Sequence, residues 1–110
     1  NPAAGQAKNA AAAALGEDLS LKLVVVVDDD VDITRDQDVM WAMCTRMQAD
    51  RDVDILKNCM GAILDPSNDD GLTAKMVIDA TRPTDDFPPR HTLPADAIDR
   101  ARSLIEKYFP

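Results

Sequence analysis

The chain has 110 residues, a length that fits one domain with a single hydrophobic core and leaves little room for two. Hydrophobic residues make up 45% of the chain and charged residues 29%, a mixture typical of globular proteins. The formal charge of −8 repels phosphate backbones and anionic membrane surfaces, so the composition argues against nucleic-acid and membrane binding. No apolar run approaches the roughly 20 residues that a membrane span needs.

The cysteines and the first residues bear on the cellular context. Cys44 and Cys59 have the spacing of neither a zinc site nor a CxxC redox pair, so we expect two reduced thiols in a cytoplasmic protein. The chain opens on "NPAAGQAKNA", without an initiator methionine. We therefore expect it to be a piece of a longer protein.

The first segments predict a helix followed by a strand. Residues 1–15 are alanine-rich and precede Gly16, a residue that terminates helices well, which favours a leading helix. Residues 19–27, "LSLKLVVVV", are β-branched and end in a continuous apolar run. That pattern is typical of a strand covered on both faces.

Residues 38–48, "DVMWAMCTRMQ", predict an amphipathic helix. Trp41, the only tryptophan, is expected to pack in the core. The candidates for the N-cap are Thr34, Asp36 and Asp38. The face expected to turn toward the core consists of Val39, Met40, Met43, Cys44 and Met47.

The second half predicts two strands, two irregular segments and a final helix. Residues 53–58 alternate like a strand, and residues 75–81 form another short strand. The loop between them, 59–74, is rich in Gly, Pro, Asn and Asp, and loops of that length are often functional. Residues 82–94 form a proline-rich connection, and residues 95–109 form an amphipathic C-terminal helix.

The order of these elements favours an α/β fold in a single domain, 1–110. We expect a small, largely parallel or mixed sheet of three to four strands, with helices packed on its faces. A sheet this small leaves an edge that a partner domain could cover.

An aspartate cluster follows the valine strand, where open α/β sheets usually place ligands. Asp28, Asp29, Asp30 and Asp32 offer the oxygen ligands that magnesium prefers. No phosphate-binding loop follows the strand, however, and the spacing does not fit an EF-hand. Neighbouring residues of an extended backbone also point to opposite faces. We favour a strand end whose carboxylates face water and cap the next helix, with a metal or acid–base site as the alternative.

The single histidine carries little evidence for catalysis. His91 lies in the proline-rich connection, and no serine or cysteine nucleophile stands at a suggestive spacing. We expect it to be a surface residue. Residue chemistry alone identifies no self-sufficient active site in this chain.

Five segments between Leu23 and Pro83 together resemble a known family. The segments "VVVVDDDVDI", "DVMWAMCTR", "DRDVDI", "GAILDPS" and "KMVIDATRP" occur in order and at plausible separations. They resemble the C-terminal domain of the UbiD family, decarboxylases and carboxylases that use prenylated flavin mononucleotide. Val77 departs from the pattern, because many relatives have glycine before "IDAT".

The resemblance implies that the catalytic machinery lies outside this chain. In the family, the flavin, a divalent metal, potassium and an Arg–Glu–Glu catalytic group belong to another domain. No catalytic, cofactor-binding or metal-binding residue is therefore assigned here, and the isolated fragment is expected to be inactive. The C-terminal domain contributes subunit contacts to a homo-oligomer and one wall of the pocket for an aromatic or α,β-unsaturated carboxylic acid.

By resemblance, four residues are expected in that pocket wall. Ala62 and Leu64 correspond to side chains that line the aromatic-substrate pocket of ferulate-type relatives. Met60 corresponds to an arginine at the pocket rim, and Ser20 falls near a pocket-lining threonine. Because those relatives have phenylalanine at the position of Ala62, we expect a different, bulkier acid. The alternative from another class is a free-standing acidic α/β interaction or cation-binding module.

Overall fold

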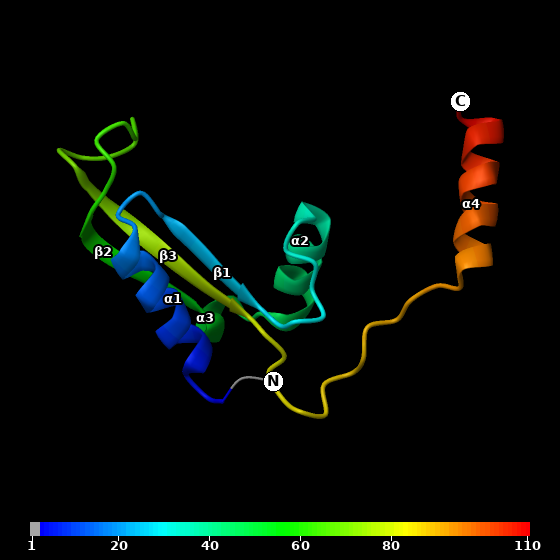
Figure 1. The fold of residues 1–110 in the computed structure, drawn as a ribbon, viewed down its shortest axis with the longest axis horizontal. Coiled ribbons are helices and arrows are strands. Elements are labelled where there is room, and N and C mark those ends of the chain that lie inside the picture. The colour runs from blue at the N-terminus through cyan, green and yellow to red at the C-terminus, as the bar shows by residue number, and fades with distance from the viewer. Residues whose placement is uncertain (1–2) are drawn as a thin grey trace.

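A computed structural model describes residues 3–110 and shows a three-stranded sheet at the centre of the fold (Figure 1). The strand order is β1 (Leu23–Val27), β3 (Leu72–Ala80), β2 (Val53–Met60). β1 pairs with β3 in parallel, whereas β2 pairs with β3 antiparallel. The expected α/β fold with a small mixed sheet is confirmed.

Four helices accompany the sheet: α1 (Gln6–Glu17), α2 (Asp36–Arg46), the short α3 (Ala49–Asp52) and α4 (Ala95–Tyr108). α1 and α2 lie on opposite faces of the sheet (Figure 1). Within the part of the chain that the structure describes, no helix has both the length and the apolar content needed to cross a membrane.

The leading helix differs in its bounds from the expected 1–15. Residues 1–2 lie outside the described residues, and Gly5 precedes the helix in the left-handed region with φ of 80°. Gly16 lies inside the helix rather than after it, because the chain turns away at Asp18, whose backbone N–H still donates to Ala14.

The β2–β3 connection is shorter than the expected 59–74, because both strands extend into it. Met60 of β2 still pairs with Leu72 of β3. The register of β2 shifts between Leu56 and Cys59, where Asn58 takes a φ of 58°. Such an irregularity bends an edge strand and redirects the loop that follows it.

α1 covers one face of the sheet with its smallest side chains. Ala7 and Ala11 are 4% and 0% exposed. Alanine brings the helix backbone close to the strands, so the β1 side chains that face α1 are partly covered. An exposed ion pair, Lys8 Nζ to Asp54 Oδ2 at 2.9 Å, joins α1 to the edge strand β2.

On the opposite face, α2 covers only the carboxyl end of β1 and β3. The buried apolar cluster there consists of Val31, Ala42, Ile78 and Ala80. The expected core face of α2 is wrong at Met40, which is 58% exposed, and at Cys44, which is also exposed. Val39, Met43 and Met47 do pack against the apolar cluster. Asp38 and Arg46 are buried as well, because both form ion pairs.

The expected N-caps of α2 are also wrong. Arg35 occupies the N-cap and makes no side-chain capping bond. Asp38 instead accepts a hydrogen bond from the backbone N–H of Asp32 at 3.0 Å. Thr34 donates its backbone N–H and its hydroxyl to Asp32. The acidic residues thus fold the β1–α2 connection on itself rather than capping the helix.

The other half of the α2 face of the sheet stays open. Leu23, Met76 and Ile55 are neighbours in register across the three strands. Their exposed fractions are 52%, 38% and 61%. An apolar row therefore crosses the sheet beyond the reach of α2.

α4 stands away from the sheet at the end of residues 81–94, which contain no helix or strand (Figure 1). None of its residues is buried. The radius of gyration is 18.2 Å, whereas a compact domain of this length would have about 13 Å. The C-terminal arm, residues 81–110, is therefore an extension of the body.

Candidate functional site

The connection between β2 and β3, residues 61–71, is closed at its base by backbone hydrogen bonds. Gly61 N–H donates to Gly71 C=O at 2.9 Å. Asp69 and Leu72 exchange hydrogen bonds at 3.0 and 2.9 Å around the turn formed by Asp70 and Gly71, whose φ values are positive. We call this segment the β2–β3 loop.

A second set of contacts orders the middle of the β2–β3 loop. Asp65 Oδ1 accepts from the backbone N–H of Ser67 at 2.9 Å and from its hydroxyl at 2.6 Å. The side-chain amide of Asn68 donates to the carbonyl of Ala62. This turn leaves Ile63 and Leu64 projecting from the loop, with 95% and 93% of their surface exposed.

Gly61 is required by a close approach. A Cβ at this position would lie 2.8 Å from Asn68 Nδ2 and 2.9 Å from Thr73 Cγ2. Thr73 is buried. Any side chain at position 61 would therefore push the loop off β3.

One basic residue outside the β2–β3 loop holds it. Lys22 Nζ lies 2.7 Å from Asp65 Oδ2 and 2.7 Å from Ser67 Oγ. The Lys22 ammonium and then the Ser67 hydroxyl lower the pKa of Asp65 to about 2, so this carboxylate is ionised at neutral pH. The loop is thereby tied to the residue that precedes β1.

The structure places the four expected pocket-wall residues at one end of the sheet. Met60 ends β2 and is 69% exposed, Ala62 is half-buried and Leu64 projects from the loop. Ser20 is exposed in the α1–β1 connection, which reaches the same end of the sheet (Figure 1). Lys22 joins the two segments, whereas the backbone N–H of Ser20 donates to Asp18 in its own connection.

Sequence reasoning missed Ile63 and Lys22. Ile63 stands next to the expected Leu64 and is equally exposed. A signal for it existed in the apolar pair that precedes "DPS" in a polar loop. Lys22 gave no such signal, because its partners lie 43 and 45 residues away.

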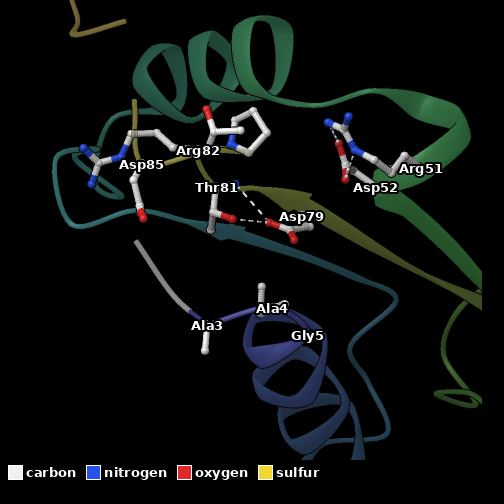
Figure 2. A pocket seen from close by; sticks show the side chains of 12 residues that line it. Ala3, Ala4, Gly5, Arg51, Asp52, Asp79, Thr81, Arg82 and Asp85 are labelled. Carbon is white, nitrogen blue, oxygen red and sulfur yellow. Dashed lines mark hydrogen bonds and ion pairs between the residues drawn. The ribbon is translucent and has the colours of Figure 1, made fainter. Parts of the chain in front are cut away.

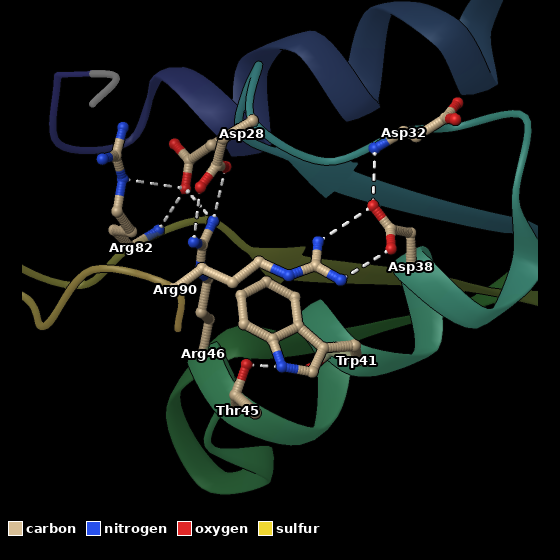
Figure 3. Close-up of polar contacts among 9 residues, drawn as sticks. Asp28, Asp32, Asp38, Trp41, Thr45, Arg46, Arg82 and Arg90 are labelled. Atoms are coloured by element: carbon tan, nitrogen blue, oxygen red, sulfur yellow. Dashed lines mark hydrogen bonds and ion pairs between the residues drawn. The ribbon is translucent and has the colours of Figure 1, made fainter. Parts of the chain in front are cut away.

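The aspartate cluster at the other end of β1 binds arginines (Figure 3). Arg46 donates to both oxygens of Asp30 at 2.8 and 2.7 Å and to Asp28 at 3.1 Å. The side chains of Arg46 and Asp28 are 1% and 2% exposed. Hydrogen bonding to Asp30 raises the pKa of Arg46, and the same bond lowers the pKa of Asp30.

The expectation that these carboxylates face water is wrong for Asp28. Its Oδ2 also accepts the backbone N–H of Arg82 at 2.7 Å, and Arg82 Nε lies 3.4 Å away. A buried carboxylate needs such partners, because an unpaired charge in the interior is very costly. Asp28 therefore joins β1 to α2 and to the start of the C-terminal arm.

A second arginine of the C-terminal arm binds α2. Arg90 donates to both oxygens of Asp38 at 3.0 and 2.8 Å. Arg90 and the backbone N–H of Asp32 lower the pKa of Asp38 well below its usual range. Trp41 packs against the apolar cluster, as expected, and its ring also contacts two guanidinium groups, with its centroid 4.2 Å from Arg90 and 4.9 Å from Arg46.

No group of His, Cys, Asp and Glu side chains within residues 3–110 has the arrangement of a metal site. Asp28, Asp30 and Asp38 are engaged with arginines instead. His91 lies exposed in the C-terminal arm. Asp28 and Asp30, two of the carboxylates that suggested a cation site, therefore hold α2 on the sheet.

A cavity of about 770 Å³ lies between the start of α1 and the carboxyl end of β3 (Figure 2). Two pairs form among its polar groups: Arg51 with Asp52, and Thr81 with Asp79. None of the four expected pocket-wall residues lines it.

A sequence profile of the 3-octaprenyl-4-hydroxybenzoate carboxy-lyase C-terminal domain matches residues 1–80. The chain belongs to the UbiD family. The match includes β1, α2 and the β2–β3 loop and ends with β3. The family suggested by the five segments is thus confirmed.

Relatives of known activity align with most of this chain, but the aligned region is only a small part of each relative. Anhydromevalonate phosphate decarboxylase of Aeropyrum pernix is 53% identical over 81 residues, which are 74% of this chain and 18% of that protein. Phenolic acid decarboxylase of Sedimentibacter hydroxybenzoicus is 46% identical over 88 residues, 78% of this chain and 18% of that protein. The chain therefore spans about a fifth of these relatives.

Solved structures show the same fold. The UbiD-class enzyme HmfF from Pelotomaculum thermopropionicum, in complex with FMN, has a TM-score of 0.78 and 42% identity, covering 93% of this chain and 24% of that one. Apo 3,4-dihydroxybenzoic acid decarboxylase of Klebsiella pneumoniae has a TM-score of 0.74 and 31% identity, covering 96% and 23%. An evolved form of HmfF, described as dimeric, contains prenylated FMN.

Proposed function

We propose that the complete polypeptide is a prenylated-flavin-dependent decarboxylase or carboxylase acting on an aromatic or α,β-unsaturated carboxylic acid. In it, this chain contributes one wall of the substrate pocket and part of the subunit contacts. The flavin, a divalent metal and potassium are held by the rest of the polypeptide. Membership in the UbiD family supports the chemistry, and the free thiols Cys44 and Cys59 agree with a cytoplasmic location.

The observation that supports the assignment of this chain to a pocket wall is the apolar tip of the β2–β3 loop. Ile63 and Leu64 are almost fully exposed, yet they sit on a loop fixed by hydrogen bonds at its base and middle. An exposed apolar pair on an ordered loop is suited to contact another surface. An apolar wall also excludes water, and a dry pocket raises the energy of a carboxylate relative to uncharged carbon dioxide.

The subunit contacts are supported by the C-terminal arm. The apolar residues exposed on one side of α4 include Ile98, Leu104, Ile105 and Tyr108. An amphipathic helix with no buried residue is unstable as a free element, so its apolar side needs a covering surface. We assign that surface to a second copy of the polypeptide in a homo-oligomer.

The alternative of a free-standing cation-binding module has less support. Two of its four candidate ligands, Asp28 and Asp30, are occupied by Arg46, and Asp32 accepts hydrogen bonds from Thr34. Adding magnesium to this chain should leave its melting temperature unchanged. A magnesium-dependent rise that disappears in Asp30→Asn would favour the alternative.

The test of the catalytic proposal is carbon dioxide release by the complete polypeptide reconstituted with prenylated FMN. The acids to compare include the substrates named by relatives: anhydromevalonate phosphate, phenolic acids and gallate. Decarboxylation of at least one acid is expected. Absence of decarboxylation and carboxylation of every acid tested would contradict the proposal.

The test of the pocket wall is the order of rates across the same acids. Ala62→Phe and Leu64→Ala should change the relative kcat/KM values much more than the melting temperature. Met40→Ala is a matched control, because Met40 is a large exposed apolar residue on α2 rather than on the loop. If both loop variants kept the parent's relative rates, the assignment to the pocket wall would be wrong.

A further inference from the structure

The β2–β3 loop has many internal hydrogen bonds and few to the rest of the fold. The bonds of Asp65 with Ser67, and of Asn68 with Ala62, run within the loop. The base bond from Gly61 to Gly71 closes the loop. A contact between the middle of the loop and the rest of the fold therefore bears on the direction in which the loop points.

That contact is the ammonium group of Lys22. It reaches Asp65 Oδ2 and Ser67 Oγ, each at 2.7 Å, and these are the residues that order the middle of the loop. Within residues 3–110, these are the two contacts by which side chains of the loop bond to β1 and the segment that precedes it. The Asp65 side chain is 17% exposed, so the pair is partly shielded from water.

The segment that carries Lys22 is itself anchored. The buried ammonium group of Lys75, in the middle of β3, donates to the backbone carbonyl of Leu19 at 2.9 Å. The backbone carbonyl of Lys22 accepts from the N–H of Met76 at 2.8 Å. Lys22 thus connects the loop to a segment that is hydrogen-bonded to the sheet.

We propose that Lys22 is a positioning residue, whose ammonium group fixes the direction in which Ile63 and Leu64 face the substrate. This inference rests on the proposed function, because it takes the tip of the β2–β3 loop as a pocket wall. A lysine suits the task, since one compact charge with three donors can bond a carboxylate and a hydroxyl at once.

The first experiment measures the tie itself by amide hydrogen exchange in this chain. In Lys22→Met, exchange at the loop amides of Ser67 and Asn68 should become about five- to tenfold faster, the scale of a charged hydrogen bond discounted for exposure. Lys8→Met is the matched control, because it removes a lysine–aspartate pair of 2.9 Å that does not touch the loop. Equal exchange at these amides in both variants would overturn the proposal.

The second experiment measures positioning in the complete polypeptide with its flavin. Lys22→Met should raise KM and change the ratio of kcat/KM between small and bulky acids, whereas Lys8→Met should leave that ratio unchanged. A purely structural loss would lower all rates by one factor, because it only reduces the amount of folded enzyme. Lys22→Arg keeps the charge and should recover part of the parent ratio.

The outcomes separate the two proposals. If the parent polypeptide is active and Lys22→Met leaves the substrate ratio unchanged, positioning by Lys22 is wrong and the proposed function stands. If the parent polypeptide decarboxylates and carboxylates no acid tested, the proposed function fails, and faster loop exchange in Lys22→Met would then report only a structural tie.

Discussion

Replacing Arg46 by methionine should strongly destabilise this chain. The substitution keeps a long side chain on α2 but removes two hydrogen bonds to Asp30 and one to Asp28. Asp30 can turn to water, because its side chain is 37% exposed. Asp28 cannot, because its side chain is 2% exposed. The main cost is therefore a buried carboxylate that has lost its nearest guanidinium.

The magnitude follows from that imbalance. Removing one partner of a buried ion pair costs about 3–5 kcal/mol. Asp28 retains the backbone N–H of Arg82 at 2.7 Å, which places the expected loss near the lower limit, about 3 kcal/mol. The free energy of unfolding of a small domain is only about 5–15 kcal/mol. The expected loss should therefore lower the melting temperature by roughly 10–20 °C.

The assay is urea unfolding monitored by far-UV circular dichroism. The dependence of the free energy of unfolding on urea concentration is compared between variants. Fluorescence is less suitable, because Trp41 contacts Arg46 directly. Arg51→Met is the matched control, since Arg51 is half-exposed and pairs with the adjacent Asp52. A loss below about 1 kcal/mol for Arg46→Met, or one no greater than that of the control, would refute the argument from a buried pair.

Three further outcomes are expected from other parts of the fold. Gly61→Ala should lower the free energy of unfolding by about 1–3 kcal/mol, because the added methyl group overpacks against Asn68 and Thr73. Gly16→Ala should raise it by up to about 1 kcal/mol in the same thermal melts, because the space around this position in α1 is open. Because the pKa of Asp65 falls from 3.8 to about 2 on folding, its ionised form stabilises the fold above pH 4, and the melting-temperature difference between the parent and Asp65→Asn should vanish as the pH falls toward 2. Asp38→Asn should release Arg90, so trypsin should cleave after Arg90 several-fold faster, and unchanged cleavage would show that this pair does not hold the arm.

The sheet could be anticipated from local patterns. Four valines in a row predicted β1, and alternation from Val53 predicted β2. The limits of the strands were harder, because pairing rather than propensity sets them: β3 begins at Leu72 since that residue has a partner in Met60. The mixed sheet follows from the same connection, which is a loop without a crossover helix and so reverses the chain.

The ion cluster illustrates what local patterns miss. Amphipathicity assigns arginine to the water side of a helix, yet Arg46 is buried. A signal was present in the spacing, because Arg46 follows Val39 by seven positions and so shares its inward face. The partners of that arginine could not be found in the same way, since Asp28 is 18 residues away and Arg82 is 54 residues from Asp28.

The core of this chain is thin, and this bears on how much the ion cluster matters. No large side chain among the described residues is fully buried, while apolar side chains stay exposed on the open sheet face, the loop tip and α4. Hydrophobic burial within the chain is therefore smaller than its composition allows, and the buried Asp28–Arg46 pair holds α2 on a sheet that few apolar contacts secure. Under the proposed function, the rest of the complete polypeptide and a second copy of it cover the loop tip and α4. The destabilisation by Arg46→Met should accordingly lower the melting temperature less there than in this chain, and an equal or larger fall in the complete polypeptide would show that the neighbouring domain does not support this face.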